Sequence, residues 1–178
     1  MVTQVYYTIF MGLIALERIA ELFVARRNAA LSFAKGAKEF GKEHYPYMVL
    51  LHLFLLFGCV VEVWFFDRSF SPIVGALSLS LAVFCQALRW WVIYTLGFMW
   101  NTRVIVVPGC ARISHGPFRW LKHPNYVAVV IEGIVLPLGH GAWFTALVFT
   151  IANAVLLTIR IRCEEKALSS NLHARNDG

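Results

Sequence analysis

Two polar clusters contain most of the residues that could bind a ligand or take part in a reaction. The first runs from His115 to Tyr126 (HGPFRWLKHPNY), and the second from Arg160 to Lys166 (RIRCEEK). In the first cluster, Pro124 is suited to open a helix, because its missing N–H would be unpaired in the first turn. His123 would then lie at a helix N-terminus, where backbone N–H groups and the helix dipole favour a ligand carboxylate.

The second cluster places Arg160 and Glu164 one helical turn apart, as it does Arg162 and Lys166. The simpler interpretation is a set of long charged side chains that reach from a helix end to water and form an exposed ion pair. The functional interpretation is that both clusters converge at one membrane face and form a binding site there.

The composition indicates which kind of protein carries these clusters. The chain has 178 residues, of which 59% are hydrophobic and 15% are charged, whereas soluble domains are about 45–50% apolar and about 25% charged. This excludes a disordered chain and indicates an integral membrane protein. The net charge of +6 lies mostly between apolar runs and forms no basic face for nucleic acid. The four cysteines include no CxxC pair, so neither a metal site nor a redox pair is expected.

Five apolar runs predict an all-α bundle of about five transmembrane helices, in a single domain over residues 1–178. The runs cover residues 5–25, 46–66, 73–97, 126–138 and 142–159. The fourth would rise only about 20 Å as a helix, less than the roughly 30 Å hydrocarbon core of a bilayer.

Lys and Arg concentrate in alternate connections between these runs. Residues 26–43 hold five and residues 100–123 hold four, whereas residues 67–71 hold one and residues 139–141 hold none. The tail from residue 160 holds four more. By the positive-inside rule, this predicts a multi-pass protein of the cell membrane, with its N-terminus outside and its C-terminus and both polar clusters at the cytoplasm.

Two connecting segments also carry structural signals. Residues 31–40 could form an interfacial amphipathic helix or a plain charged loop. Residues 100–107 (WNTRVIVV) are rich in β-branched side chains and are followed by Pro108 and Gly109, which predicts a short extended or hairpin-like piece.

Ionisable residues lie within the predicted spans, where each costs several kcal/mol unless it is paired or hydrated. They are Glu17, Arg18, Glu21, Glu62, Arg89 and Glu132. They either pair across helices and lock the bundle, or line a polar cavity inside it. Since Glu132 lies close to the first cluster, we expect it to contact a substrate.

The two clusters resemble the motifs of the isoprenylcysteine carboxyl methyltransferase family, membrane-embedded enzymes that use S-adenosylmethionine. Residues 116–126 are similar to the family pattern Gly-x-Tyr-x-x-x-Arg-His-Pro-x-Tyr, and residues 160–168 to its closing Arg-x-x-x-Glu-Glu-x-x-Leu. Lys122 replaces the usual Arg, Phe118 replaces a common Tyr, and the tail lacks the family's Gly-Glu-x-Tyr-type segment. The last difference argues against a prenylated cysteine as the substrate.

Short matches in the N-terminal half resemble a bacterial branch of the family. Among them are Glu17-Arg18, His44-Tyr-Pro46 and Arg89-Trp-Trp91. Its members accompany type III polyketide synthases and O-methylate long-chain alkylpyrones or alkylresorcinols. The resemblance implies a lipophilic small-molecule substrate, membrane lipids as surroundings and such a synthase as a pathway partner. Alternatives are a prenylcysteine carboxyl or phospholipid methyltransferase, or a small transporter or structural subunit, although a transporter would usually show an inverted repeat.

The resemblance and the positions of the charges together predict the site. Arg160 and Glu164 are the expected catalytic residues, and Arg160 and Glu132 the expected substrate contacts. The expected cofactor contacts are Cys110, Ala111, Arg112, Ile113, Phe118, His123, Pro124, Asn125, Tyr126, Glu164 and Glu165.

Overall fold

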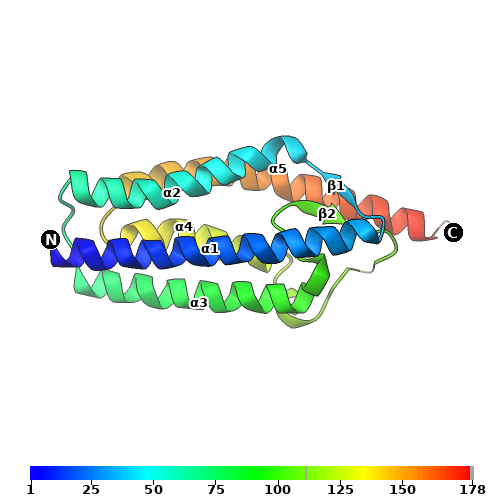
Figure 1. The fold of residues 1–178 in the computed structure, drawn as a ribbon, viewed down its shortest axis with the longest axis horizontal. Coiled ribbons are helices and arrows are strands. Elements are labelled where there is room, and N and C mark those ends of the chain that lie inside the picture. The colour runs from blue at the N-terminus through cyan, green and yellow to red at the C-terminus, as the bar shows by residue number, and fades with distance from the viewer. Residues whose placement is uncertain (111, 177–178) are drawn as a thin grey trace.

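Five long helices form the protein. The computed structural model describes residues 1–110 and 112–176, with side chains through residue 170. The helices are α1 (Val2–Ala34), α2 (Tyr45–Phe65), α3 (Pro72–Leu96), α4 (Pro124–Leu138) and α5 (Trp143–Asn176). They run along the long axis of the molecule as one bundle (Figure 1). Each of the five predicted apolar runs therefore lies in a helix.

The described residues include three helical stretches that are long and apolar enough to cross a membrane. These are Lys42–Phe65, Pro72–Met99 and Trp143–Ser170, and α4 is a shorter apolar helix. Many large apolar side chains point away from the bundle, such as Phe57 and Val83, which are 67% and 60% exposed. Since soluble proteins rarely expose such continuous apolar surface, the fold is that of a membrane protein.

Prolines mark the starts of three helices. Pro46, Pro72 and Pro124 occupy the first or second position of α2, α3 and α4, where a missing N–H costs nothing. The prediction that Pro124 opens a helix with His123 as its N-cap residue is confirmed.

The connection after α1 differs from both interpretations of residues 31–40. The prediction of an interfacial amphipathic helix is wrong, because α1 continues to Ala34 and ends at a turn in which Gly36 has φ 76°. The chain then forms β1 (Lys38–Phe40), which pairs antiparallel with β2 (Val104–Val106). The extended piece predicted within residues 100–107 is confirmed, but the protein is not strictly all-α.

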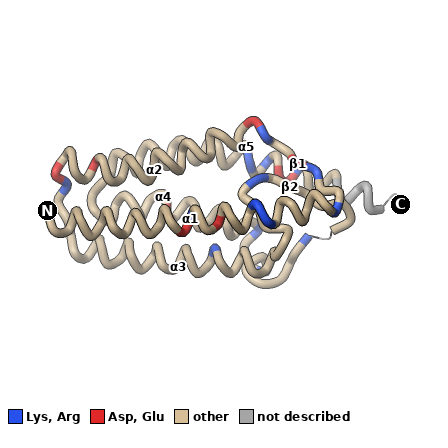
Figure 2. Tube along the Cα trace, viewed as in Figure 1, with Lys and Arg blue, Asp and Glu red and all other residues tan. Residues whose placement is uncertain are grey.

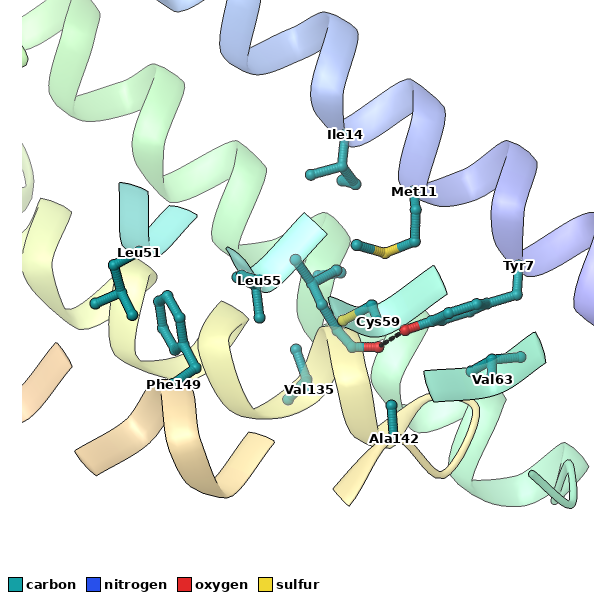
Figure 3. Close-up of a cluster of buried hydrophobic side chains, with 12 residues drawn as sticks. Tyr7, Met11, Ile14, Leu51, Leu55, Cys59, Val63, Val135, Ala142 and Phe149 are labelled. Atoms are coloured by element: carbon teal, nitrogen blue, oxygen red, sulfur yellow. Dashed lines mark hydrogen bonds between the residues drawn. The ribbon is translucent and has the colours of Figure 1, made fainter. Parts of the chain in front are cut away.

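A buried apolar core joins α1, α2, α4 and α5 in the half of the bundle away from this ribbon. Tyr7, Met11 and Ile14 of α1 point toward Cys59 and its neighbours on α2 (Figure 3). The hydroxyl of Tyr7 donates a 2.9 Å hydrogen bond to the backbone carbonyl of Leu136. The core thus fixes α1 against α2 and α4.

A buried ion-pair network ties α1 to α3 and α4. The guanidinium of Arg18 lies 2.9 Å from Glu21 and 3.2 Å from Glu132, and it also pairs with Glu17. Arg89 of α3 lies 3.2 Å from Glu21 and pairs with Glu132 as well. Figure 2 shows the two acidic positions of α1 in the middle of the apolar bundle. These residues therefore do pair across helices, as the first of the two interpretations predicts.

Glu62 serves a separate purpose at the opposite end of the bundle from β1 and β2. Its carboxylate accepts hydrogen bonds from the backbone N–H of Phe144 at 3.1 Å and of Thr145 at 2.7 Å. These N–H groups lie in the first turn of α5, where they have no partner within the helix. Arg68 donates to the same carboxylate at 2.9 Å. Glu62 is thus a buried cap for α5.

We predict that Glu62→Ala destabilises the protein by about 3 kcal/mol, because the substitution leaves Arg68 and the helix N–H groups without their acceptor. Thermal and denaturant unfolding in detergent would measure the loss. Glu43→Ala, at an exposed position, is the control and should unfold like the wild-type protein. Equal stability of the two variants would contradict the capping role.

Candidate active site

The two polar clusters predicted from the sequence lie together at the end of the bundle that carries β1 and β2. The first residues of α4 approach the charged turn of α5 (Figure 1). The hydroxyl of Tyr126 donates a hydrogen bond to the carboxylate of Glu164. The ring Nε2 of His123 lies 3.1 Å from Oε1 of Glu165.

Arg160 is held by two partners. Its Nε donates to the hydroxyl of Tyr126 at 2.9 Å, and its terminal nitrogen donates to the carbonyl of Thr102 at 2.6 Å. The guanidinium also lies 5.6 Å from the centre of the Tyr126 ring. The simpler interpretation, an exposed pair of Arg160 with Glu164, is therefore replaced by a partly buried chain of hydrogen bonds in which Tyr126 lies between the two charges.

The two neighbouring glutamates have different roles. Glu164 lines a cavity together with His123 and Tyr126. Glu165 pairs with Lys122, whose side chain is 58% exposed, and it is absent from the lining of that cavity among the described residues. The structure thus assigns Glu164, rather than Glu165, to the wall of the site.

This first cavity, which we call the donor cavity, is bounded by four parts of the chain. They are β2, the segment that follows β2, the start of α4 and the charged turn of α5. The cavity has about 1050 Å³ of space and is partly open. Nine of the residues predicted to contact a cofactor line it: Cys110, Arg112, Ile113, Phe118, His123, Pro124, Asn125, Tyr126 and Glu164. Ala111 lies outside the described residues.

Part of the donor cavity was not predicted. Val104–Val106 of β2 form one wall, together with Trp100 and Asn101. The run of β-branched residues signalled a strand, but not its place beside the site. The indole Nε1 of Trp100 is buried without a hydrogen-bond partner in the described part of the chain.

A second cavity, the lateral groove, lies between α1 and α2. It has about 1700 Å³ of space, and its walls are mostly apolar side chains such as Met11, Leu53 and Phe57. Arg18, Glu21 and Arg89 of the ion-pair network also reach it.

The donor cavity and the lateral groove meet. The two cavities share five lining residues: Trp100, Asn101, Asn125, Tyr126 and Arg160. A polar molecule in one cavity and an apolar molecule in the other would therefore face each other across the same few side chains. Such a site can move a group from a water-soluble donor to a lipophilic acceptor.

Glu132 does not lie where we expected. It is 5% exposed, it is engaged by Arg18 and Arg89, and among the described residues it lines neither cavity. The guanidinium of Arg89 also lies 3.4 Å from Oδ1 of Asn125, which faces both cavities. Glu132 thus supports the site through Arg89.

Hydrogen bonds with α1 hold the segment between α3 and β2, which forms part of the wall of the site. The amide of Asn28 donates to the carbonyls of Gly97 and Trp100, at 3.0 and 2.9 Å. Asn101 donates to the carbonyl of Ala25 at 2.8 Å. These bonds fix the segment that carries Thr102, whose carbonyl in turn accepts from Arg160.

Comparison with known proteins places the chain among membrane methyltransferases. Residues 77–170 match the model of the isoprenylcysteine carboxyl methyltransferase (ICMT) family. The chain is similar to the uncharacterized protein YpbQ of Bacillus subtilis, with 39% identity over 163 residues that cover 91% of this chain and 96% of the relative. It is also similar to an uncharacterized protein of Haemophilus influenzae, with 28% identity over 153 residues, 85% of this chain and 88% of that relative.

We predict that Asn28→Leu loosens the segment between α3 and β2, because the buried carbonyl of Trp100 and the carbonyl of Gly97 lose their donor, at a cost of about 2 kcal/mol. Limited trypsin digestion should then cut faster after Arg103, the basic residue of this segment. Ser80→Ala, which removes only an exposed hydroxyl bonded within its own helix, is the control. Unchanged digestion of Asn28→Leu would show that this anchor does not hold the wall.

Proposed function

The chain belongs to the isoprenylcysteine carboxyl methyltransferase family, and from this premise we propose that it O-methylates a lipophilic substrate with S-adenosylmethionine. The observation that carries the proposal is the junction of the donor cavity with the lateral groove at Tyr126 and Arg160. A water-soluble methyl donor and a membrane-soluble acceptor need separate compartments that touch at one point.

The residues of the donor cavity suit S-adenosylmethionine. The carboxylate of Glu164 would pair with the cationic amino group of the cofactor, and the N-terminus of α4 at His123 would favour its carboxylate. Val104 and Val106 would offer an apolar surface to the adenine.

When bound, S-adenosylmethionine supplies a methyl group already activated on a positively charged sulfur. The protein therefore contributes mainly by positioning, which can be worth roughly 7–11 kcal/mol in ideal cases. Arg160 would hold the acceptor oxygen as an anion, with its own guanidinium fixed by Tyr126 and Thr102. An acceptor that is acidic enough to ionise in water loses its proton before it binds, so the site needs no strong general base.

We propose a long-chain alkylpyrone, or a related type III polyketide product, as the acceptor. An acidic hydroxyl on a small ring suits the cation of Arg160, and an alkyl chain suits the apolar walls of the groove. The supplying reaction would be that of a type III polyketide synthase. A prenylcysteine carboxylate and a phospholipid headgroup are the competing acceptors.

We further propose that the protein is a multi-pass protein of the cell membrane with its site at the cytoplasm. Lys and Arg gather around the end of the bundle that holds the site (Figure 2), which supports this orientation under the positive-inside rule. S-Adenosylmethionine would then reach the donor cavity from the cytoplasm, while the acceptor arrives through the bilayer.

We predict that S-adenosylhomocysteine raises the melting temperature of the purified protein, because a ligand that binds only the folded state stabilises it. Labelled cofactor should transfer its methyl group to an alkylpyrone in preference to a prenylcysteine or a phospholipid. Arg160→Ala should reduce this transfer by roughly a hundredfold or more, since it removes the group that holds the oxygen anion.

Arg162→Ala is the matched control, because Arg162 lies on the same turn of α5 but is exposed and lines neither cavity. It should retain near-normal transfer. If S-adenosylhomocysteine neither bound nor stabilised the protein, the methyltransferase proposal would fail. Preferred methylation of another acceptor would instead reject the alkylpyrone alone.

A further inference from the structure

The lateral groove runs along α1 and α2 away from the site and has a definite end. We propose that it selects substrates by the length of their alkyl chain, and that Gly12 sets the space available to the chain's end. This inference rests on the proposed function, because it assumes that the acceptor's oxygen is held at Arg160.

The groove starts at the site and follows one face of α1. Its α1 wall includes a row of residues spaced three or four apart, which places them on one side of the helix: Thr8, Gly12, Ala15, Ile19 and Leu22. Met11, Arg18 and Glu21 border this row. From Leu22 to Thr8 the helix rises about 21 Å. The opposite wall is formed by α2, from Tyr45 near the site to Val60. A single extended chain of fatty-acid length fits this distance.

The far end of the groove is closed by contacts between the two helices. The indole Nε1 of Trp64 donates a 2.9 Å hydrogen bond to the hydroxyl of Thr8. One helical turn further out, the amide of Gln4 donates to the carbonyl of Val63 at 3.3 Å and to Asp67 at 3.1 Å. Helices α1 and α2 are therefore joined beyond Thr8.

The interior behind this end is already filled. Tyr7 and Met11, 8% and 2% exposed, pack toward Cys59 and Val63 of α2 (Figure 3). A chain that reaches Thr8 can therefore continue neither between the helices nor beneath them, and any longer part would have to leave the groove sideways into the bilayer.

Gly12 lines the groove and faces open space. A Cβ built there meets no described heavy atom within 4 Å, other than its own helix and chain neighbours, and Gly12 lines the groove one turn before Thr8. The next residue on this face, Ala15, is also small. A larger side chain at Gly12 would therefore start in open space beside the groove, where we expect it to occupy the place of the chain's last carbons.

The occupant we assign is the alkyl chain of the substrate, because the groove is continuous with the site at Tyr126 and Arg160. Its walls include exposed apolar residues, such as Leu53 at 44% and Phe57 at 67%, so a chain can move in sideways from the bilayer. An acyl chain of a bilayer lipid has the same chemistry, and the experiment distinguishes the two.

The test compares two alkylpyrones that differ only in chain length, one with an octyl and one with a hexadecyl chain. Gly12→Leu should lower kcat/KM for the hexadecyl acceptor by roughly tenfold or more, because several methylenes lose their place, and leave the octyl acceptor unchanged. Trp64→Ala, which opens the far end, should raise the relative rate of acceptors longer than hexadecyl. Ala20→Leu adds a similar side chain at an exposed position of α1 outside the groove and should alter neither rate.

Stabilisation by S-adenosylhomocysteine shows that each variant is folded and binds the cofactor. Equal rates of Gly12→Leu and wild type for both acceptors, or an equal loss for both, would overturn the length limit while the proposed function stands. A change only in the lipid that copurifies with Gly12→Leu would likewise overturn it, in favour of a bilayer lipid in the groove. If the wild-type protein methylated neither acceptor, the alkylpyrone would be rejected as acceptor and the length limit with it, whereas failure to bind S-adenosylhomocysteine would reject the methyltransferase proposal itself.

Discussion

The hydroxyl of Tyr126 is the contact on which the site depends. It accepts a hydrogen bond from Arg160 and donates one to Glu164, so it joins the start of α4 to the charged turn of α5. It also separates the two charges, which leaves Glu164 facing the donor cavity and Arg160 facing both cavities.

The rest of the fold holds this contact in position inside an apolar environment. The ion-pair network of Arg18 and Arg89 with three glutamates anchors α1 to α3 and α4, and breaking one such buried pair is costly. Asn28 anchors the segment that carries Thr102, the second acceptor of Arg160. Polar groups within the bundle therefore have two roles. They fix the helices relative to one another, and they hold the residues of the site in position.

The sequence predicted the helices and the meeting of the two clusters, because apolar runs, Pro124 and a tight turn between α4 and α5 are local signals. It did not predict the pairing of β1 with β2, since three-residue strands far apart in the chain carry no periodicity. Nor did it place Glu132, because a buried carboxylate beside a motif looks the same in sequence whether it contacts a substrate or two guanidinium groups. The lateral groove depends on how α1 and α2 diverge, which no local pattern encodes.

The most direct test of the account is an experimental structure with S-adenosylhomocysteine and an alkyl-chain acceptor bound together. The account predicts the cofactor product in the donor cavity beside Glu164, the acceptor's oxygen at Arg160 and its chain between α1 and α2. An acceptor oxygen far from Arg160, or a chain lying outside the lateral groove, would contradict the claim that the two compartments meet at Tyr126.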